Sequence, residues 1–340
     1  MNQLEQARAQ IDTVDRQMAA LFEQRMAAVR QVIEYKQATG MPILDSGREA
    51  QVIEKNTAYI AEEVLRPYYA DLLRAQMALS RQYQAYVLGR DVVAHQGAEG
   101  AYSHIALTRL FPRAKALSLA TFDEVFDAVR DGRAAYGVIP FENSTAGDVS
   151  DVLDLLYNHS LYIVQMYDLP IRHNLLGVPG AHLRDVTDVY GHPQALRQSE
   201  AFLTKMGLAT HAWPPQAPNN ALAAQYVAAQ KDPTKAATAS AEAAALYGLE
   251  VLAEDINTDS DNTTRFIVLS REKPTVGNRF SLLFTLDNKP GKLAEVIQVI
   301  GRFGYDMESI KSRPLPHVPF DYYFYVELVG DPSAAETAAL

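Results

Sequence analysis

The 340-residue sequence contains no cysteine, which excludes disulfide bonds, thiolate metal ligands and a cysteine nucleophile. It has no run of about 18 apolar residues, so we expect no membrane-spanning helix. No basic and apolar signal segment precedes the first helical pattern. Together these absences favour a protein of the cytoplasm.

Positive charge is also scarce, with 31 Lys and Arg against 41 Asp and Glu and a net charge of −10. This balance argues against nucleic acid or an anionic membrane as the main partner. The eight histidines lack metal-ligand spacing, and no nucleotide-binding or nucleophile-elbow motif occurs. We therefore expect no metal and no cofactor, and an anionic ligand would need local cationic pockets. The length favours two or three domains.

Residues 4–88 have helical periodicity almost throughout and predict helices near 4–37, 48–59 and 63–87. The first helix would be about 50 Å long, too long to be covered by two shorter helices of the same chain. It carries a heptad pattern typical of a helix that packs against a partner, so we expect a second subunit. The two rows of this pattern are Leu4, Ile11, Met18, Arg25 and Val32, and Ala7, Val14, Leu21, Ala28 and Tyr35.

Charged and polar residues interrupt this helical region at regular intervals. Arg25 lies in an apolar row, and Lys36 follows on the same face about 16 Å away, so the two could hold a small dianion. Ser80 and Gln84 form a polar i, i+4 pair where apolar residues are expected. Arg25 could instead fix helix registry, Ser80 could be ordinary core polarity, and Glu49 could be a capping residue.

Arg8 is about 26 Å from Arg25 along the helix, too far to share one small ligand within a chain. An antiparallel partner helix crossing near Leu21 would place its own residue 8 opposite position 34, beside Lys36. The predicted site then draws on both chains.

These residues, together with the segment from Asp45 to Glu49, resemble the signature of all-helical chorismate mutases. The resemblance implies an intertwined dimer in which Arg8 of the partner subunit completes each site. It implies that arginines bind the two carboxylates, that Lys36 and Gln84 donate to the ether oxygen, and that Glu49 accepts from the ring hydroxyl. The implied mutase site comprises Arg8, Arg25, Lys36, Asp45, Arg48, Glu49, Ser80 and Gln84. Rearrangement of chorismate to prephenate needs a compact conformer and charge stabilisation, but no nucleophile or metal.

Residues 90–272 have a different pattern, in which short apolar runs alternate with helical stretches. The pattern predicts α/β units around mainly parallel sheets, in two lobes with a cleft between them. Polar loops are expected beyond the carboxyl ends of strands, where such sheets bind ligands. These loops are residues 97–103, 140–144, 191–194 and 262–266.

Three of these loops, read as Glu142-Asn143-Ser144, His192-Pro193-Gln194 and Thr264-Arg265-Phe266, resemble the motifs of prephenate dehydratase across residues 91–271. The first loop departs from the family, with His95-Gln96-Gly97 in place of Gly-Pro and alanine at position 101. The resemblance implies a two-lobed, periplasmic-binding-like α/β fold that converts prephenate to phenylpyruvate with loss of carbon dioxide and water.

In this reaction Thr264 resembles the donor to the departing hydroxyl, acting with neighbours because threonine is a weak acid. Glu142 is the alternative acid if it is buried, and Arg265 suits a bidentate contact with a carboxylate. Phe266 could keep the departing carboxylate poorly solvated. Thr264 could also be a simple strand former, and Asn143, Ser144, His192 and Gln194 could serve loop structure. The implied site comprises Ser103, Asn143, Ser144, His192, Gln194, Thr263, Thr264, Arg265 and Phe266.

Residues 278–340 predict strands at 280–286, 305–312 and 322–328, a helix at 292–303 and a second helix starting at 331. This βαββα order is one strand short of βαββαβ, so the chain could be truncated. It resembles the α+β ACT regulatory domain, which implies feedback inhibition by phenylalanine bound between paired domains. Lys292 and Lys311 depart from the family, and a fold used only for dimerisation stays open. The candidate regulatory residues are Pro290, Gly291, Leu293, Ser312, Arg313 and Pro314.

We therefore interpret the chain as multidomain, with an all-α intertwined domain at 1–89, a two-lobed α/β domain at 90–272 and an ACT-like domain at 278–340. It resembles the bifunctional chorismate mutase/prephenate dehydratases of phenylalanine biosynthesis, and we expect a homodimer or a higher homo-oligomer. Two alternatives are a two-lobed anion-binding protein with a helical dimerisation arm, and an arogenate dehydratase.

Overall fold

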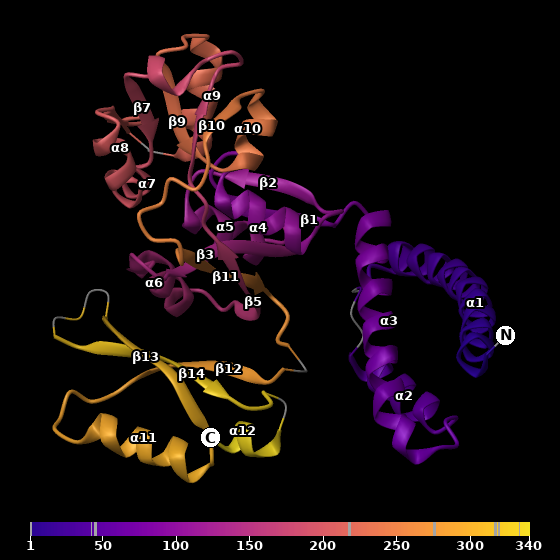
Figure 1. Cartoon of the computed structure of the whole chain (residues 1–340). Coiled ribbons are helices and arrows are strands. Elements are labelled where there is room, and N and C mark those ends of the chain that lie inside the picture. Colours follow the sequence, from indigo (N-terminus) through magenta and orange to yellow (C-terminus); the bar gives the residue numbers. More distant parts are fainter. Residues whose placement is uncertain are drawn as a thin grey trace. The chain divides into compact units, whose positions relative to one another are not determined.

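The computed structural model describes residues 2–41, 43, 46–216, 219–274, 277–315, 318, 320–332 and 334–340. The chain divides into two compact units, Met1–Asp91 and Val92–Leu340 (Figure 1). Among the described helices, none has the length and apolar character needed to cross a membrane.

The N-terminal unit is all-helical, as predicted. It consists of α1 (Gln3–Thr39), α2 (Ser46–Thr57), a single 3-10 turn (Glu63–Leu65) and α3 (Arg66–Val87). Helix α1 begins at a capping box formed by Asn2 and Glu5 and ends at Gly40, whose φ of 71° suits glycine.

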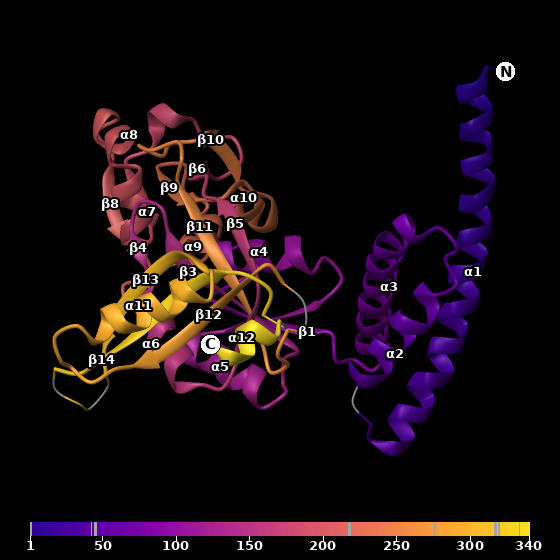
Figure 2. The same cartoon turned by 90° about the horizontal axis from the view of Figure 1, so that it is seen from below.

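Helix α1 has 37 residues and α3 has 22, which correspond to lengths of about 55 and 33 Å. The N-terminal part of α1 runs beyond α2 and α3 (Figure 2). The buried residues of α1 are Met26 and Ile33, whereas heptad residues Leu4, Ile11 and Leu21 are 57%, 58% and 61% exposed. The heptad seam is therefore solvent-exposed in a single chain.

The first lobe of the second unit is a six-stranded sheet flanked by three helices. Its elements are β1 (Val92–Gln96), α4 (Tyr102–Leu110), β2 (Lys115–Leu119), α5 (Phe122–Arg130), β3 (Tyr136–Asn143), β4 (Gly147–Asp148), α6 (Ser150–Asn158), β5 (Tyr162–Pro170) and β11 (Thr263–Ser270). The main strand order is β2-β1-β3-β11-β5, with β4 paired to β3. One face of the sheet packs on α4, and the other packs on α5 and α6.

The second lobe is a five-stranded sheet in the order β10-β6-β9-β7-β8. Its elements are β6 (Asn174–Gly177), a 3-10 turn (Leu183–Asp185), β7 (Asp188–Gly191), α7 (Pro193–Gln198), α8 (Glu200–Lys205), β8 (Ala209–Ala212), α9 (Asn220–Gln230), β9 (Lys235–Ala239), α10 (Ala241–Tyr247) and β10 (Glu250–Ala253). Its core is rich in alanine, because α9 and α10 approach the sheet closely.

The prediction of mainly parallel sheets was wrong, because both sheets are mixed. In the first lobe β11 runs antiparallel to both β3 and β5, and in the second β6 runs antiparallel to β9 and β10. The chain crosses between the lobes after β5 and returns just before β11, which places β11 between β3 and β5 in the opposite direction.

The two crossing segments are hydrogen-bonded to each other. Ile171 N donates to Asn262 O at 2.8 Å, and Ile256 N donates to His173 O at 2.8 Å. The side chain of Asn257 adds bonds to His173 N and Ile171 O. The connection between the lobes is therefore a paired and ordered structure.

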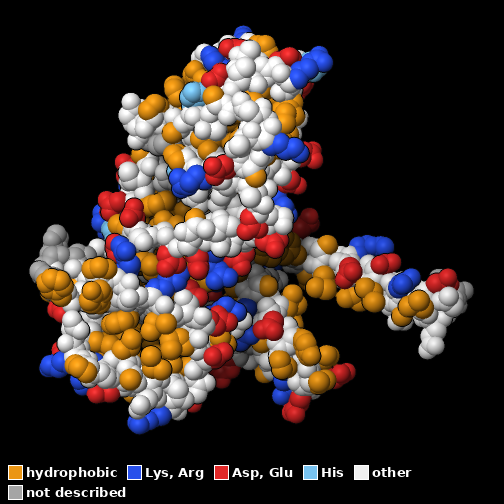
Figure 3. All heavy atoms as spheres, turned by 60° about the vertical axis from the view of Figure 1, so that its left-hand side comes forward, with side chains coloured by type: hydrophobic (Ala, Val, Ile, Leu, Met, Phe, Trp, Pro, Cys, Tyr) orange, Lys and Arg blue, Asp and Glu red, His pale blue; other side chains and the backbone are white. Residues whose placement is uncertain are grey.

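The C-terminal module follows the predicted βαββα order. It contains β12 (Arg279–Thr285), α11 (Lys292–Arg302), β13 (Asp306–Pro314), β14 (Tyr322–Val329) and α12 (Ala335–Ala339), with strand order β12-β14-β13. Helix α11 covers one face through a cluster around Ile300 and Val326. Exposed apolar side chains lie over this module (Figure 3) and include Ile297, Phe303 and Phe320.

The other face of this small sheet packs on the first lobe. Tyr325 is fully buried in the core of that lobe, and its ring centroid lies 5.3 Å from that of Phe141 on β3. Arg313 makes a bidentate contact with Asp154 on α6, at 3.1 and 2.6 Å. The hydrogen bond from Arg313 lowers the pKa of Asp154, and Tyr323 also donates to this carboxylate.

Two candidate active sites

The helical unit gathers several of its predicted site residues between α1 and α3. Arg25 donates to Ser80 Oγ, and Ser80 in turn donates to Gln76 O at 2.8 Å. Ser80 and Gln84 are 5% and 7% exposed, and burial lowers the pKa of Arg25. Gln84 Oε1 is buried without a partner among the residues described, so a half-turn of this amide would break no hydrogen bond of Oε1 and would place the Nε2 donor at that position.

The remaining mutase candidates lie outside this Arg25–Ser80 contact. Lys36 donates to Ile43 O, and Glu49 on α2 forms an ion pair with Arg81 on α3. Arg8 is exposed near the far end of α1, and Arg48 is exposed at the start of α2. Asp45 lies outside the described residues. A single chain thus holds Arg25, Ser80 and Gln84 together but not Arg8.

Sequence reasoning did not identify Arg81, which follows Ser80 directly. Its role depends on how α2 folds back on α3, and heptad spacing within α3 does not reveal this. The ion pair with Glu49 fixes the carboxylate that the chorismate mutase resemblance assigns to the ring hydroxyl.

In the second unit, Thr264 and Asn143 are register partners on neighbouring strands β11 and β3. Both had been expected in loops, but each lies at the end of a strand. The correction has a physical cause, because β-branched Thr263 and Thr264 extend the apolar run of β11.

The amide of Asn143 organises this strand end. Its Oδ1 accepts from the backbone N–H groups of Thr145 and Ala146 at 3.2 and 3.0 Å, and these groups can only donate. The amide orientation is therefore fixed, and Nδ2 donates to Thr264 Oγ1 at 2.9 Å and to Asn262 Oδ1 at 2.7 Å. Because Thr264 Oγ1 accepts this bond, its own proton remains available to a ligand.

Asn262 belongs to the predicted polar loop 262–266 but was not among the predicted site residues. It is 2% exposed, and its Nδ2 has no hydrogen-bond partner among the described residues. Its Oδ1 accepts from Asn143 Nδ2 at 2.7 Å, so Asn262 holds in place the amide that donates to Thr264.

Several predicted residues act on local structure here. Ser144 Oγ donates to Asp261 O and accepts from Thr263 N, which fastens β3 to the start of β11. His192 caps α7, since its Nδ1 accepts from Gln194 N at 3.1 Å, and burial lowers the pKa of His192. Ser103 is buried in the first turn of α4.

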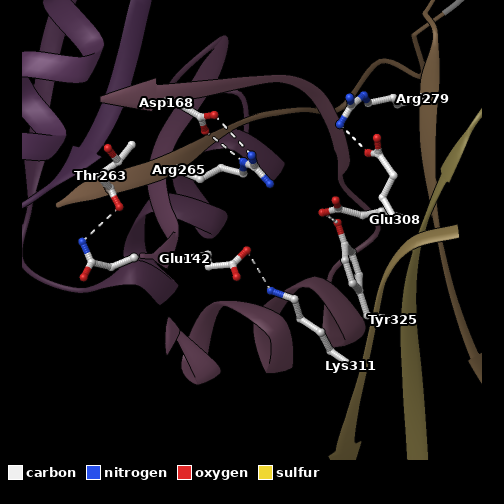
Figure 4. Close-up of polar contacts among 10 residues, drawn as sticks. Glu142, Asp168, Thr263, Arg265, Arg279, Glu308, Lys311 and Tyr325 are labelled. Carbon is white, nitrogen blue, oxygen red and sulfur yellow. Dashed lines mark hydrogen bonds and ion pairs between the residues drawn. The ribbon is translucent and has the colours of Figure 1, made fainter. Parts of the chain in front are cut away.

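Glu142 and Arg265 lie on the opposite face of the sheet from Asn143 and Thr264, because successive residues of a strand alternate in direction. Arg265 makes a bidentate contact with Asp168 at 2.9 and 3.2 Å, and Glu142 pairs with Lys311 of β13 at 3.2 Å (Figure 4). In this structure neither side chain meets Thr264. The expectations of Glu142 as the acid and of Arg265 as a carboxylate ligand therefore lack geometric support.

Phe266 lies on the same face of β11 as Thr264, because it is two residues further along the strand. Its side chain is 1% exposed. It packs in the first-lobe core with Leu169 and Ile171. It supports the strand from within and has no open surface for shielding a substrate.

Gln198, the last residue of α7, connects the second lobe to this site. Its Nε2 donates to Thr145 Oγ1 at 2.6 Å, and its Oε1 lies 3.0 Å from His173 Nε2. Neither Gln198, His173 nor Thr145 was identified from the sequence. They are distant along the chain, and no motif spacing links them.

A buried histidine near the first loop gives a pH-dependent prediction. His95 is fully buried, with Nε2 2.9 Å from Ser118 Oγ, and burial together with the charge of His104 lowers its pKa to about 4. As the pH falls, His95 of the unfolded protein is protonated near pH 6.5, whereas His95 of the folded protein is protonated only near pH 4. The free energy of unfolding should therefore fall by about 3 kcal/mol between pH 6.5 and 4 through this group.

The variant His95→Gln should show a shallower dependence of unfolding free energy on pH over that range. Urea unfolding at pH 7 and pH 4.5 measures this. An equal drop in variant and parent would disprove the role of His95.

The fold and the two sites define a class of enzyme. In this class an all-helical domain, with a partly buried arginine between α1 and α3, precedes a two-lobed α/β domain with a threonine hydroxyl at the end of β3 and β11. The family model for prephenate dehydratase matches residues 93–274, and that for type II chorismate mutase matches residues 7–85. The chain belongs to the prephenate dehydratase family and carries a chorismate mutase domain. It is thus an enzyme with an isomerase and a lyase domain.

Individual relatives agree with this assignment. A bifunctional chorismate mutase/prephenate dehydratase of Aquifex aeolicus is 29% identical over 97% of this chain and 91% of its own length. The arogenate dehydratase/prephenate dehydratase 2 of Arabidopsis thaliana is 36% identical over 84% of this chain and 78% of its own. The structure of a prephenate dehydratase from Arthrobacter aurescens, solved in complex with L-Phe, has 26% identity and a TM-score of 0.65 over 73% of this chain and 83% of that one.

Proposed function

We propose that the helical domain converts chorismate to prephenate and that the two-lobed domain converts the released prephenate to phenylpyruvate. The observation that carries this proposal is the Asn143–Thr264 hydrogen bond, in which Thr264 Oγ1 is the acceptor, so its own hydrogen is left to donate to a ligand. The same chain holds the Arg25–Ser80 contact in its helical domain. The product of the first reaction is then the substrate of the second.

In the mutase site Arg25 binds one carboxylate, and Arg8 of the partner subunit binds the other. Lys36 and Gln84 stabilise negative charge on the breaking ether oxygen, while Glu49 accepts from the ring hydroxyl. The exposed heptad seam of α1 supports a dimer, because burying its nine apolar side chains against a second α1 removes a large apolar area from water.

In the dehydratase site the electron pair of the breaking carbon–carboxylate bond moves into the ring and expels the ring hydroxyl. Thr264 donates its proton to this leaving group, which departs as water, and Thr264 regains a proton from its surroundings. Aromatisation of the ring supplies the driving force.

Arogenate is the alternative substrate of the second site, since it differs from prephenate by an amino group in place of the keto oxygen. The test incubates purified protein with chorismate and follows prephenate and then phenylpyruvate, with arogenate assayed in parallel. A kcat/KM that is higher for arogenate than for prephenate would show that the second site is an arogenate dehydratase. If no prephenate forms from chorismate, the mutase proposal is refuted.

For the C-terminal module we propose binding of phenylalanine as a feedback effector. A small pocket at the start of α11, where Gly291 has a φ of 86°, supports this proposal. The pocket is lined by Leu286, Asp287, Asn288, Lys289, Lys292, Leu293, Tyr322 and Phe324. Arg313 is occupied by Asp154, so it holds the module on the first lobe.

A further inference from the structure

Two carboxylates face each other across the β3–β4 hairpin of the first lobe. Glu142 and Asp148 are register partners in this antiparallel pair, so their side chains leave the sheet on the same face. These side chains are 40% and 36% exposed, so water screens their repulsion only in part. Like charges directly opposite each other destabilise the pairing of two strands. The hairpin therefore requires a cation at this point.

Lys311 of β13, in the C-terminal module, supplies that cation. Its ammonium group donates to Glu142 Oε2 at 3.2 Å (Figure 4), and it donates to Asp148 as well. The Lys311 side chain is 9% exposed, and its Nζ lies 4.8 Å from the ring centroid of Phe141. One buried ammonium group is thus shared by two carboxylates and an aromatic ring.

Arg265 is a second cation near Glu142, but its charge is already balanced. It is the register partner of Glu142 on β11, and the two charges attract each other. Its guanidinium group makes the bidentate contact with Asp168 at 2.9 and 3.2 Å, and the charge of Glu327 on β14 also acts on it. Lys311 is therefore the cation that balances the two carboxylates of the hairpin.

The turn of the same hairpin orients the amide of Asn143. Asn143 follows Glu142 directly and lies one position closer to the turn. The backbone N–H groups of Thr145 and Ala146, within the turn, hold Asn143 Oδ1 as an acceptor. This leaves Asn143 Nδ2 to donate to Thr264 Oγ1 at 2.9 Å. Repulsion that opened the hairpin would displace the turn, and with it the amide that holds Thr264.

We propose that Lys311 is a positioning residue of the dehydratase, which neutralises the facing carboxylates of β3 and β4 and so keeps the Asn143 amide directed at Thr264. The effect passes through the sheet, because Glu142 and Asn143 are consecutive residues that point to opposite faces. A residue of the C-terminal module thereby supports a site on the other face of the first lobe. The inference rests on the proposed role of Thr264 as the donor to the leaving hydroxyl.

Replacing Lys311 with methionine removes the charge and keeps most of the apolar stem. We expect the dehydratase kcat to fall by about 10-fold, because a small displacement of a catalytic group slows the reaction, whereas KM for prephenate should change little. Lys311→Arg keeps a cation at this position and should retain most of the parental kcat. Rescue by arginine would show that the charge is the property that matters.

Removing one of the facing carboxylates gives the sharper test. In the Asp148→Asn background only Glu142 remains charged beside Lys311, so the hairpin no longer depends on a cation. Lys311→Met should then lower kcat by less than about 3-fold in a double-mutant cycle measured on kcat. A lysine that only fills space would cost the same factor in both backgrounds.

The matched control is Lys273→Met, the same substitution at an exposed position before β12, which should leave kcat unchanged. The thermal unfolding transition, followed by circular dichroism, shows whether each variant is folded. If Lys311→Met does not fold, Lys311→Gln removes the charge but keeps a hydrogen-bond donor, and it enters the same cycle.

A parental kcat in the neutral Lys311 variant, or an equal loss of kcat with and without Asp148→Asn, would overturn the inference. Failure of the proposed function is separate, since the parent enzyme itself would then form no phenylpyruvate from prephenate.

Discussion

Replacing Thr264 with alanine is expected to lower the dehydratase kcat by about 10²- to 10⁴-fold, the range for loss of a positioned proton donor. The reason is geometric. Asn143 Nδ2 occupies the acceptor side of Thr264 Oγ1 at 2.9 Å, which leaves its proton as a donor to the substrate. The measurement is the rate of phenylpyruvate formation from prephenate at saturation.

The matched control for this prediction is Thr264→Ser, which keeps the hydroxyl and should retain most of the activity. Mutase turnover should be unchanged in both variants. Unchanged phenylpyruvate formation in Thr264→Ala would show that another group supplies the proton.

Replacing Lys36 with alanine should lower mutase turnover by about 10²- to 10³-fold, the usual effect of removing one donor to a developing oxyanion. The ammonium group is held near the pocket by its bond to Ile43 O, so its position is defined before substrate binds. Conversion of chorismate to prephenate measures the effect. Lys55→Ala on the exposed side of α2 is the control and should be neutral.

The Lys36→Ala variant also tests whether Arg8 of one subunit completes the mutase site of the other. Arg8→Ala and Lys36→Ala should each be inactive alone, but each mixed dimer regains one complete site. Refolding an equal mixture should recover about one quarter of the parental mutase activity, because half of the dimers are mixed and each has one good site of two. No recovery, although mixed dimers form, would place Arg8 outside the partner's site.

The helices of the first unit could be predicted from sequence because a period of 3.6 residues and local capping define them. The same holds for the C-terminal module, whose strands and α11 lie within about two residues of their expected bounds. Local patterns were sufficient where the contacts that stabilise an element lie close in the chain.

The dehydratase site was only partly predictable. Asn143 and Thr264 belong to short motifs that could be recognised, but motif membership does not reveal which face of a strand a residue occupies. Arg265 was therefore predicted to be a substrate ligand, whereas the alternation of residues along β11 places it on the other face, where it pairs with Asp168 on β5. Gln198 and His173 belong to no motif, and their roles arise from the way the chain crosses between lobes.

The ring of Tyr325 has a consequence for the architecture of this enzyme. Since a residue near the C-terminus fills the interior of the dehydratase fold, cutting the chain before β12 would leave a ring-sized void beside Phe141. Glu142, Asp148 and Asp154 would at the same moment lose the cations Lys311 and Arg313. Removal of the C-terminal module would therefore also damage the first lobe, and any change in dehydratase activity of the truncated chain would include that damage.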